Sequence, residues 1–349
     1  MRRYEATYAD CTLSISRVPH FDPHLGLAGA AGLPPSALVS VDTNFILDQA
    51  AARLGALIPV VSTMGVGSIR LFAPTRVANE LAWNYSAAAR HRRVNPDRLL
   101  EVVNEQFMPR IRFVDMPPVD LPRDKRLMLL NGRDEDDLDV GYLGLLLSPS
   151  HVFSHDKHLR MSGFAPPTIE DLNTILAAGL AIEVSDGALV TTGFGVRVSA
   201  AGAGYAANAI AVRLEIPLWM VGLVAAIVVG LGVKWALSTP ERRDKAGRAL
   251  VAVAAEVGRM AERRALGQAV LEQRSLEAPV AFLESRVFRA LALADHPLLA
   301  REVQAAIDPG GETLTEREVR DFLSTHPSFV RVGRYRWQLG RRLTIRRLA

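Results

Sequence analysis

The pattern of apolar and polar positions between residues 37 and 176 switches repeatedly between short apolar runs and stretches with helical spacing. Short runs rich in apolar and β-branched residues predict buried strands at 37–41, 69–73, 111–115 and 151–154. Helical spacing predicts helices at 43–54, 75–90, 96–107 and 157–161, with a further helix opened by the acidic run 134–137. Strands that alternate with helices in this way predict an α/β domain with a parallel sheet.

A single long apolar run occupies residues 217–237. It holds one charge, Lys234, and Trp219 and Trp235 stand near its two ends, as interfacial aromatic residues do. A helix of about 20 residues spans the ~30 Å hydrocarbon core of a bilayer. The run therefore predicts a transmembrane helix, and a fully buried helix in a soluble core is the alternative.

The charges around this run bear on topology. Basic residues follow it, and the positive-inside rule then places its C-terminal side in the cytoplasm. A weakly apolar, small-residue-rich stretch at 188–212 would act as a partner span and bring the N-terminal domain back to the same side. We therefore expect a membrane-associated protein whose α/β domain lies in the cytoplasm. The charged, alanine-rich residues 241–275 predict a helix that lies on the membrane surface or pairs with another copy.

The C-terminal part predicts a small α+β module. Helix-length segments lie at 280–294, 297–307 and 314–326, and Thr315 with Glu318 makes a capping box at the last. Two short strands follow, joined by a turn near Gly333 and Arg334. This order resembles a winged helix, in which the third helix enters a DNA groove and the hairpin touches phosphates.

Arginines are concentrated at the end of this module. Residues 331–349 hold seven arginines and no acid, interleaved with aromatic residues. Such a composition favours contact with phosphates or single strands. The nucleic-acid-binding candidates are Arg331, Arg334, Arg336, Trp337, Arg341 and Arg342. Contact with another protein or with anionic lipid is the alternative.

These patterns divide the chain into consecutive regions. An N-terminal extension (1–35) precedes the α/β domain (36–178). A linker or weakly apolar second span (179–216) leads to the predicted transmembrane helix (217–237). A charged helical linker (238–278) then precedes the winged-helix-like domain with its basic tail (279–349).

Composition narrows the classes of partner and compartment. The formal charge is +4 and the isoelectric point about 9.4, which permits nucleic acid or anionic lipid as a partner. The single cysteine, Cys11, excludes an internal disulfide framework and a cysteine-built zinc site. It suits a reducing compartment such as the cytosol.

Acidic residues recur where the predicted strands end. Asp42 follows the first strand, Asp156 follows the fourth, Glu80 lies in the helix after the second, and Asp137 precedes the fourth. Ligands of open parallel sheets bind beyond the carboxyl ends of the strands, so we expect these acids to converge. Crowded carboxylates repel one another until a cation relieves the repulsion, and oxygen donors without His or Cys select Mg²⁺ or Mn²⁺. Such an ion activates water against a phosphodiester.

The third acid has several candidates within one acidic run: Asp134, Asp136, Asp137 and Asp139. Asp137 is favoured because Val140, Gly141 and Gly144 then form a small, apolar face that can pack on the sheet. Asp134, one turn earlier, is a candidate second ligand.

Four segments resemble, in order, the motifs of the PIN-domain nuclease family: "VDTNFILD", "APTRVANELAW", "DEDDLDVGYLGLLL" and "HVFSHDKHL". The resemblance covers residues 36–165. It implies that Asp42, Glu80, Asp137 and Asp156 bind metal or orient metal-bound water. It also implies that Asn44 and Ser154 position neighbouring carboxylates. The family cleaves RNA, or DNA flaps in some members, through metal-activated water.

Simpler interpretations stand beside this one. An acidic run at a helix start is usually solvated, Asp42 alone would cap a helix, and a lone helical Glu is ordinarily a surface residue. An aspartyl-phosphate phosphatase also places Asp after strand one, but Asn44 stands where such enzymes carry a second Asp. The histidines near the fourth strand, His151, His155 and His158, are interpreted as surface or cleft residues rather than a zinc site.

The leading hypothesis is a membrane-tethered PIN-type endonuclease of toxin or defence-effector character. RNA is the expected substrate, with DNA as the alternative, and Mg²⁺ or Mn²⁺ is the expected cofactor. Another copy of the chain and an inhibitor protein are conceivable partners, for which the sequence carries no specific motif. The second hypothesis is a non-catalytic, membrane-associated, nucleic-acid-binding regulator with a degenerate PIN scaffold.

Overall fold

The structure is a computed structural model of the chain. It describes residues 13–17, 37–54, 69–182, 185, 240–277, 282–310 and 313–347. The predicted transmembrane helix at 217–237 and the weakly apolar stretch at 188–212 lie outside these residues. In the part of the chain that is described, no helix is long and apolar enough to cross a membrane.

A four-stranded parallel sheet with strand order β4-β3-β2-β5 forms the centre of the molecule. Its strands are β2 (Ala37–Val41), β3 (Ile69–Pro74), β4 (Ile111–Val114) and β5 (His151–Phe153). Val39 on β2 stands opposite Leu71 on one side and His151 on the other. The predicted parallel α/β architecture is confirmed, and each strand begins at its predicted residue.

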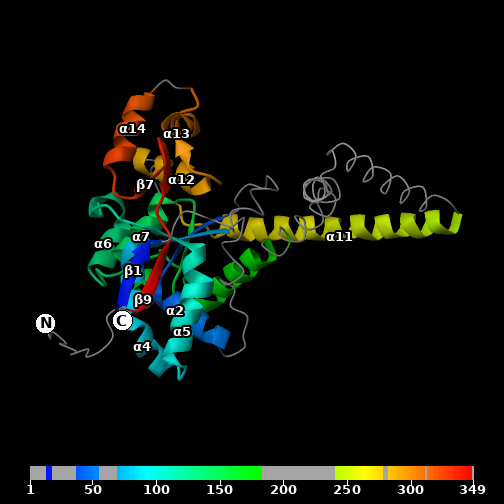
Figure 1. Ribbon diagram of the computed structural model, residues 1–349, viewed down its shortest axis with the longest axis horizontal. Helices are drawn as coiled ribbons and strands as arrows, with labels where there is room; N and C mark the ends of the chain where they lie inside the picture. The colour runs from blue at the N-terminus through cyan, green and yellow to red at the C-terminus, as the bar shows by residue number, and fades with distance from the viewer. Residues whose placement is uncertain are drawn as a thin grey trace, which may run out of the picture.

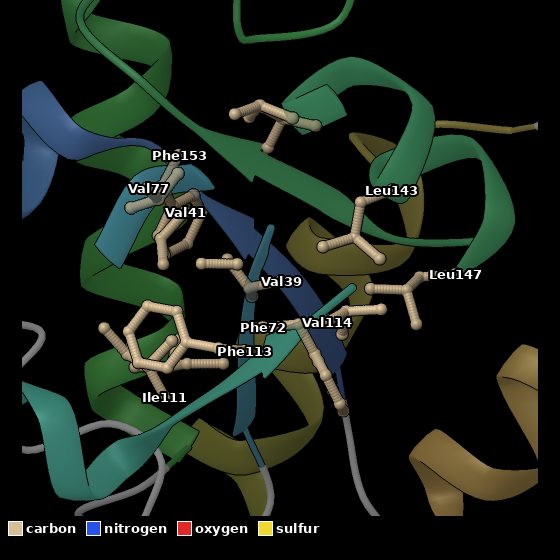
Figure 2. Packing of buried hydrophobic residues seen from close by; sticks show 14 of the residues in the cluster. Val39, Val41, Phe72, Val77, Ile111, Phe113, Val114, Leu143, Leu147 and Phe153 are labelled. Atoms are coloured by element: carbon tan, nitrogen blue, oxygen red, sulfur yellow. The ribbon is translucent and has the colours of Figure 1, made fainter. Parts of the chain in front are cut away.

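Helices connect these strands. They are α2 (Thr43–Leu54), α4 (Thr75–His91), α5 (Pro96–Val102), α6 (Lys125–Asn131), α7 (Leu138–Leu146) and α8 (Lys157–Met161). A π-turn, Val103–Phe107, and short 3-10 turns at Met108–Arg110 and Leu121–Arg123 complete the connections. Helices α2, α4 and α5 pack on one another, whereas α7 lies against β2, β3 and β5. Figure 2 shows Val39, Phe72 and Leu143 in the resulting core.

Glycine lets α7 approach the sheet closely. A Cβ atom built at Gly144 would lie 2.6 Å from Val152 Cγ2, and one at Gly141 would lie 3.1 Å from Phe164. Val140 on the same helix is buried. The small, apolar face predicted for this helix is therefore confirmed.

The C-terminal module combines three helices with a three-stranded antiparallel sheet of order β6-β8-β7. Its elements are α12 (Leu283–Leu293), β6 (Leu298–Leu299), α13 (Ala300–Ile307), α14 (Glu316–Thr325), β7 (Phe329–Val332) and β8 (Arg336–Leu339). The capping box of Thr315 and Glu318 is present. The start predicted for the second helix was wrong, because Leu298 and Leu299 form an edge strand on β8 before the helix begins.

The chain after this module returns to the α/β unit instead of ending as a free tail. Strand β9 (Leu343–Arg347) pairs antiparallel with β1 (Leu13–Arg17), and the two lie side by side in Figure 1. The backbones of Phe113 and Arg341 exchange hydrogen bonds of 2.6 and 2.8 Å. The side-chain amide of Asn104 donates a 2.8 Å hydrogen bond to the Ile345 carbonyl and accepts a 2.9 Å hydrogen bond from the Ile345 N–H. Strands β9 and β1 are thereby attached to the α/β unit.

Buried polar contacts join the module to the α/β unit. Arg70 on β3 donates hydrogen bonds of 2.6 and 2.7 Å to the carbonyls of Ala292 and Ala294 at the end of α12. At the other end of α12, Glu284 accepts a hydrogen bond of 2.5 Å from Arg123. The module therefore packs directly on the parallel sheet unit.

Helix α11 (Pro240–Gln273) confirms the prediction of a helix over 241–275 and extends away from the parallel sheet and the C-terminal module in Figure 1. Only its C-terminal end approaches the α/β unit closely. A Cβ built at Gly267 would lie 2.9 Å from the carbonyl oxygen of Ala178. Leu276, just beyond the helix, pairs with Ser150 through backbone hydrogen bonds of 3.2 and 2.6 Å.

Candidate functional site

A cleft of about 600 Å³ opens beyond the carboxyl ends of β2 and β5. Asp42 immediately follows β2, Asp156 follows the neighbouring β5, Asp137 precedes α7, and Glu80 projects from α4. The fold brings all these predicted acids to the same cleft, whose carboxylates are Asp42, Glu80, Asp134, Asp136, Asp137 and Asp156. Parallel strands end at a common edge, which is why residues more than 100 positions apart meet here.

Asp42 is the most deeply buried of these acids, with 2% of its surface exposed. Burial raises its pKa to about 6, and the charges of Glu80 and Asp156 add to this rise. The hydroxyl of the fully buried Ser154 opposes the rise by donating a 2.8 Å hydrogen bond to Oδ2. Ser154 in turn accepts a 2.9 Å hydrogen bond from the backbone N–H of Asp156. The residue expected to position a neighbouring carboxylate therefore contacts Asp42 directly.

Asp137 lies at the start of α7, and its side chain makes no capping hydrogen bond there. Burial raises its pKa to about 8, and repulsion from Asp42, Asp156 and Asp134 adds to the effect. Asp139, by contrast, does not line the cleft in the described structure. Burial raises its pKa, and the charges of Arg76 and Glu80 lower and raise this pKa, respectively. Among the candidates for the third acid, Asp137 is the one that interacts with both Asp42 and Asp156.

Glu80 is held by two side chains. The Thr43 hydroxyl donates a 2.6 Å hydrogen bond to one carboxylate oxygen, and Arg76 Nε donates a 3.1 Å hydrogen bond to the other. Arg76 also pairs with Asp136. Sequence reasoning missed both partners. Their signals were the position of Thr43 beside Asp42 and the spacing of Arg76 one helical turn before Glu80.

Asp156 caps α8: its Oδ1 accepts hydrogen bonds from the backbone N–H groups of His158 (2.5 Å) and Leu159 (3.3 Å). These bonds fix the direction of the Asp156 carboxylate, and both are made to Oδ1 and not to Oδ2. Asn44 lies exposed on the cleft wall and, among the described contacts, bonds none of the carboxylates. The positioning role expected of Asn44 is therefore not visible in these contacts.

The histidines near β5 lie in three different surroundings. His158 Nδ1 stands 3.1 Å from Asp134 Oδ2, beside the acidic cleft. His155 stands 2.7 Å from Asp48 and packs against Phe45. His151 is buried but lines two cavities near the end of α11, so its expected place in a cleft holds; burial lowers its pKa to about 4.

The donor chemistry of the cleft fits a hard divalent cation. Its ionisable ligands are carboxylates, the donors that Mg²⁺ and Mn²⁺ prefer, and Arg76 is the one cation that lines it in the described structure. The pKa values of Asp42 and Asp137 are raised mainly by burial and further by repulsion from neighbouring carboxylates, and a bound cation would oppose both effects. As the described side chains are placed, no three His, Cys, Asp or Glu residues are close enough to chelate an ion. An ion bound here would have to draw the carboxylates together.

The predicted nucleic-acid-binding residues of the module differ in their exposure and in their bonding partners. Trp337 is only 7% exposed, so its ring faces the interior and is not available to stack on a base. Arg341 pairs with Asp115 at 2.6 Å, and Arg336 donates a 2.8 Å hydrogen bond to the Pro297 carbonyl. These contacts assign Trp337 and Arg341 to the packing of the module.

The aromatic residue that the hairpin exposes is Tyr335, at 55% exposure and a φ of 81°. The guanidinium groups of Arg331 and Arg334 lie 5.4 and 6.0 Å from the centre of its ring. Together these residues form a basic, aromatic hairpin tip. The sequence places both Tyr335 and Trp337 among the arginines, and the structure shows that only Tyr335 of this pair is exposed.

Fold and cleft together define the class: a parallel α/β protein with a carboxylate cleft at the carboxyl edge of its sheet, carrying a three-helix, three-strand module. Comparison of the chain with protein-family models, curated proteins and solved structures gave no match. Function is therefore argued from the residues of the cleft.

Proposed function

We propose that this chain is a metal-dependent endonuclease of the PIN type that hydrolyses phosphodiester bonds, with RNA as the first substrate class and DNA as the second. The observation that carries the proposal is the convergence of Asp42, Glu80, Asp137 and Asp156 on one cleft. These acids come from four separate segments. Their order along the chain matches the order of the motifs that resemble those of the PIN family.

Bound Mg²⁺ or Mn²⁺ would supply an activated water and would stabilise the negative charge that develops on the phosphate. Asp42, Asp137 and Asp156 are the residues that would hold the ion. Ser154 and the backbone of Asp156 fix the position of Asp42. Thr43 and Arg76 fix Glu80, which would orient the attacking water. Without a cation the carboxylates would repel a phosphodiester and no water would be activated, so hydrolysis would require the metal.

The C-terminal module supports a second contact with nucleic acid in this proposal. The hairpin tip with Arg331, Arg334 and Tyr335 has the composition of a phosphate- and base-contacting surface. Membrane attachment through 217–237, a cytoplasmic nuclease domain and a toxin or defence-effector role remain part of the proposal. Resistance of the membrane-bound protein to carbonate extraction tests the attachment.

The substitution Asp42→Asn tests the catalytic proposal. Wild-type protein with Mn²⁺ or Mg²⁺ should cleave single-stranded RNA, and Asp42→Asn should lose more than about 100-fold in rate. Changes outside a metal's ligand shell already cost about 10–100-fold. The measurement is cleavage of end-labelled RNA and DNA on gels, with a chelator arm that should abolish activity.

Glu101→Gln is the matched control. Its side chain is 45% exposed, pairs with Arg98 and does not line the cleft, so this variant should keep most of the activity. Thermal unfolding should show that Asp42→Asn remains folded. Absence of metal-dependent cleavage by the wild type on every RNA and DNA tested, or equal activity of Asp42→Asn, would contradict the proposal.

A non-catalytic regulator is the second candidate function. It is favoured by one observation: as placed, no three described acidic side chains form a chelating group. In that case the hairpin tip would bind nucleic acid and the cleft would take no metal. Binding of Mn²⁺ separates the candidates, because only a protein with a metal site is stabilised by the ion through mass action.

A further inference from the structure

Trp83 on α4 is the most exposed large hydrophobic residue among those that the structure describes, at 74% exposure. It lines the acidic cleft. The buried face of α4 is formed by other residues, including Val77, Leu81 and Tyr85. The indole therefore contributes little to the core, and its place on the cleft wall calls for another explanation.

The position of Trp83 on its helix links it to the catalytic acid. Residues three and four apart on a helix are neighbours, with about 5–6 Å between their Cβ atoms. Trp83 stands three residues after Glu80 and four after Asn79, and all of them line the cleft. The indole is thus about one helical turn from the carboxylate that would orient water.

The composition of the cleft indicates what this indole would contact. Trp83 is the only apolar residue in the described lining; every other lining residue carries a carboxylate, an amide or a guanidinium group. A groove for a hydrophobic ligand or peptide would present several apolar side chains. A single aromatic face among hydrogen-bonding amides suits a nucleobase, which has a flat apolar face and polar edges. Asn79 and Asn84 each offer a donor and an acceptor for such edges.

We infer that Trp83 stacks on an unpaired nucleobase, and that the cleft therefore takes single-stranded nucleic acid. The inference rests on the proposed nuclease function and names the form of its substrate. In a duplex both faces of each base are covered by neighbouring bases, so an indole on a cleft wall can reach only a base that is already unstacked. Recognition through one base face also permits many sequences, because every base offers such a face.

The experiment measures binding of labelled oligonucleotides by fluorescence anisotropy in the presence of Mg²⁺. Asp42→Asn serves as the background in all proteins so that bound RNA stays intact. Adding Trp83→Ala should raise the Kd for single-stranded RNA by about 5- to 150-fold, the equivalent of about 1–3 kcal/mol for one stacked base. Trp83→Phe should keep most of the affinity because it retains an aromatic face.

Controls separate stacking from a general loss of binding. Leu266→Ala, which removes a similarly exposed apolar side chain from the distant α11, should leave the Kd unchanged. A fully paired duplex should bind equally with and without Trp83. One abasic position in the single strand should weaken binding to the tryptophan protein and have a smaller effect on Trp83→Ala. A parallel set with single-stranded DNA shows whether the 2′-hydroxyl matters.

Each outcome has a distinct meaning. Equal Kd values for Trp83 and Trp83→Ala on single-stranded RNA and DNA, or an equal loss on the duplex, would overturn the inference, whether or not the wild type cleaves RNA. A Trp83-dependent single-strand affinity without metal-dependent cleavage by the wild type would sustain the inference and remove the nuclease proposal.

Discussion

Individual residues of the cleft are held in surroundings that oppose their charge. Asp42 and Asp137 are both largely removed from solvent, and each also feels the repulsion of neighbouring carboxylates, so the pKa of each is raised above its usual value. Such strain is common at sites whose chemistry needs it, and uncommon where a side chain only supports the fold. A bound cation would remove the conflict, which makes the protonation of these acids a measurable property of the metal-free protein.

The stability of the metal-free protein should fall as the pH rises from about 6 to 8, whereas at lower pH the lowered pKa of the buried His151 acts in the opposite direction to the raised pKa of Asp42. The pKa values of Asp42 and Asp137 in the folded state, about 6 and about 8, exceed the ordinary 3.8, so the folded protein holds more protons than the unfolded chain in between. Their contribution is complete below about pH 4 and is lost through about pH 6 for Asp42 and about pH 8 for Asp137. Thermal unfolding with a chelator from pH 4 to 8 measures this. Asp137→Asn should flatten the fall between pH 6 and 8.

Glu105→Gln, at an exposed position away from the cleft, is the control and should leave the pH dependence unchanged. Mn²⁺ should raise the Tm of the wild type more at pH 8 than at pH 5, because metal and protons compete for the same oxygens. At a metal concentration 100 times the Kd the gain is about 2.7 kcal/mol. A flat pH profile and no response to Mn²⁺ would argue against the clustered acids and favour the regulator.

Single elements position the site through close packing. Helix α7 carries Asp137 at its start and lies on the sheet along its glycine face, where Gly144 contacts Val152 of β5. The same strand leads to Ser154 and Asp156. The depth at which α7 sits on β5 therefore sets the separation between Asp137 and Asp156.

Gly144→Ala should destabilise the protein. Its new Cβ would meet Val152 Cγ2 at 2.6 Å and Leu276 Cδ2 at 3.1 Å, and overpacking of this kind costs about 1–3 kcal/mol. The better helix propensity of alanine offsets up to about 1 kcal/mol. We expect a net loss of about 1–2 kcal/mol in the free energy of unfolding, measured by urea denaturation.

Gly258→Ala on α11 is the matched control, because nothing lies within 4 Å of its new Cβ. It should be neutral or stabilising by up to about 1 kcal/mol. If crowding against Val152 is the cause, Gly144→Ala combined with Val152→Ala should cost less than the sum of the single changes. A neutral Gly144→Ala would show that α7 moves freely on the sheet.

On the scale of the whole molecule, the α/β unit and the C-terminal module share one polar network. Burial alone would raise the pKa of Glu284, but hydrogen bonds from His326 and Arg123 lower it below its usual value. The Tyr142 hydroxyl, on α7, also bonds Glu284 at 3.3 Å. The network therefore connects the helix that carries Asp137 to the module with the basic hairpin.

Glu284→Ala should destabilise the whole protein and not the module alone. Removing one member of a buried ion pair costs about 3–5 kcal/mol, and we expect about 3 kcal/mol because Glu284 and Arg123 keep 14% and 17% exposure. Urea denaturation followed by tryptophan fluorescence and circular dichroism measures the change. Glu284→Gln should lose less, since it retains an acceptor.

An exposed pair on the module supplies the comparison. Arg317→Ala, which removes an 89% exposed partner of Asp321, should change stability by less than about 1 kcal/mol. Two separate unfolding transitions in the wild type would show that the units are independent, and the network would then have no role in joining them.

The periodicity of the sequence was sufficient to predict the strands and helices of the α/β unit. Runs of β-branched residues identified the parallel strands, and the acids at their ends predicted the cleft, because the carboxyl ends of parallel strands must share an edge. The glycine spacing of α7 identified its packing face and favoured Asp137 over its acidic neighbours. The strand and helix predictions succeeded because they depend on residues a few positions apart, and the shared cleft followed from the parallel arrangement of the strands.

Tertiary structure alone decided the contacts between distant segments. Nothing local marks β9 as the partner of β1, Arg341 as the partner of Asp115, or Trp337 as buried and Tyr335 as exposed. The sequence by itself determined the strands and helices of the α/β unit and which end of its sheet carries the acids. Tertiary packing decided which side chains face solvent, which arginines are already paired and which indole borders the cleft. That packing includes the contacts of the module and of strands β1 and β9 with the α/β unit. This packing is stabilised by many contacts between residues far apart in the chain, and no local sequence pattern predicts it.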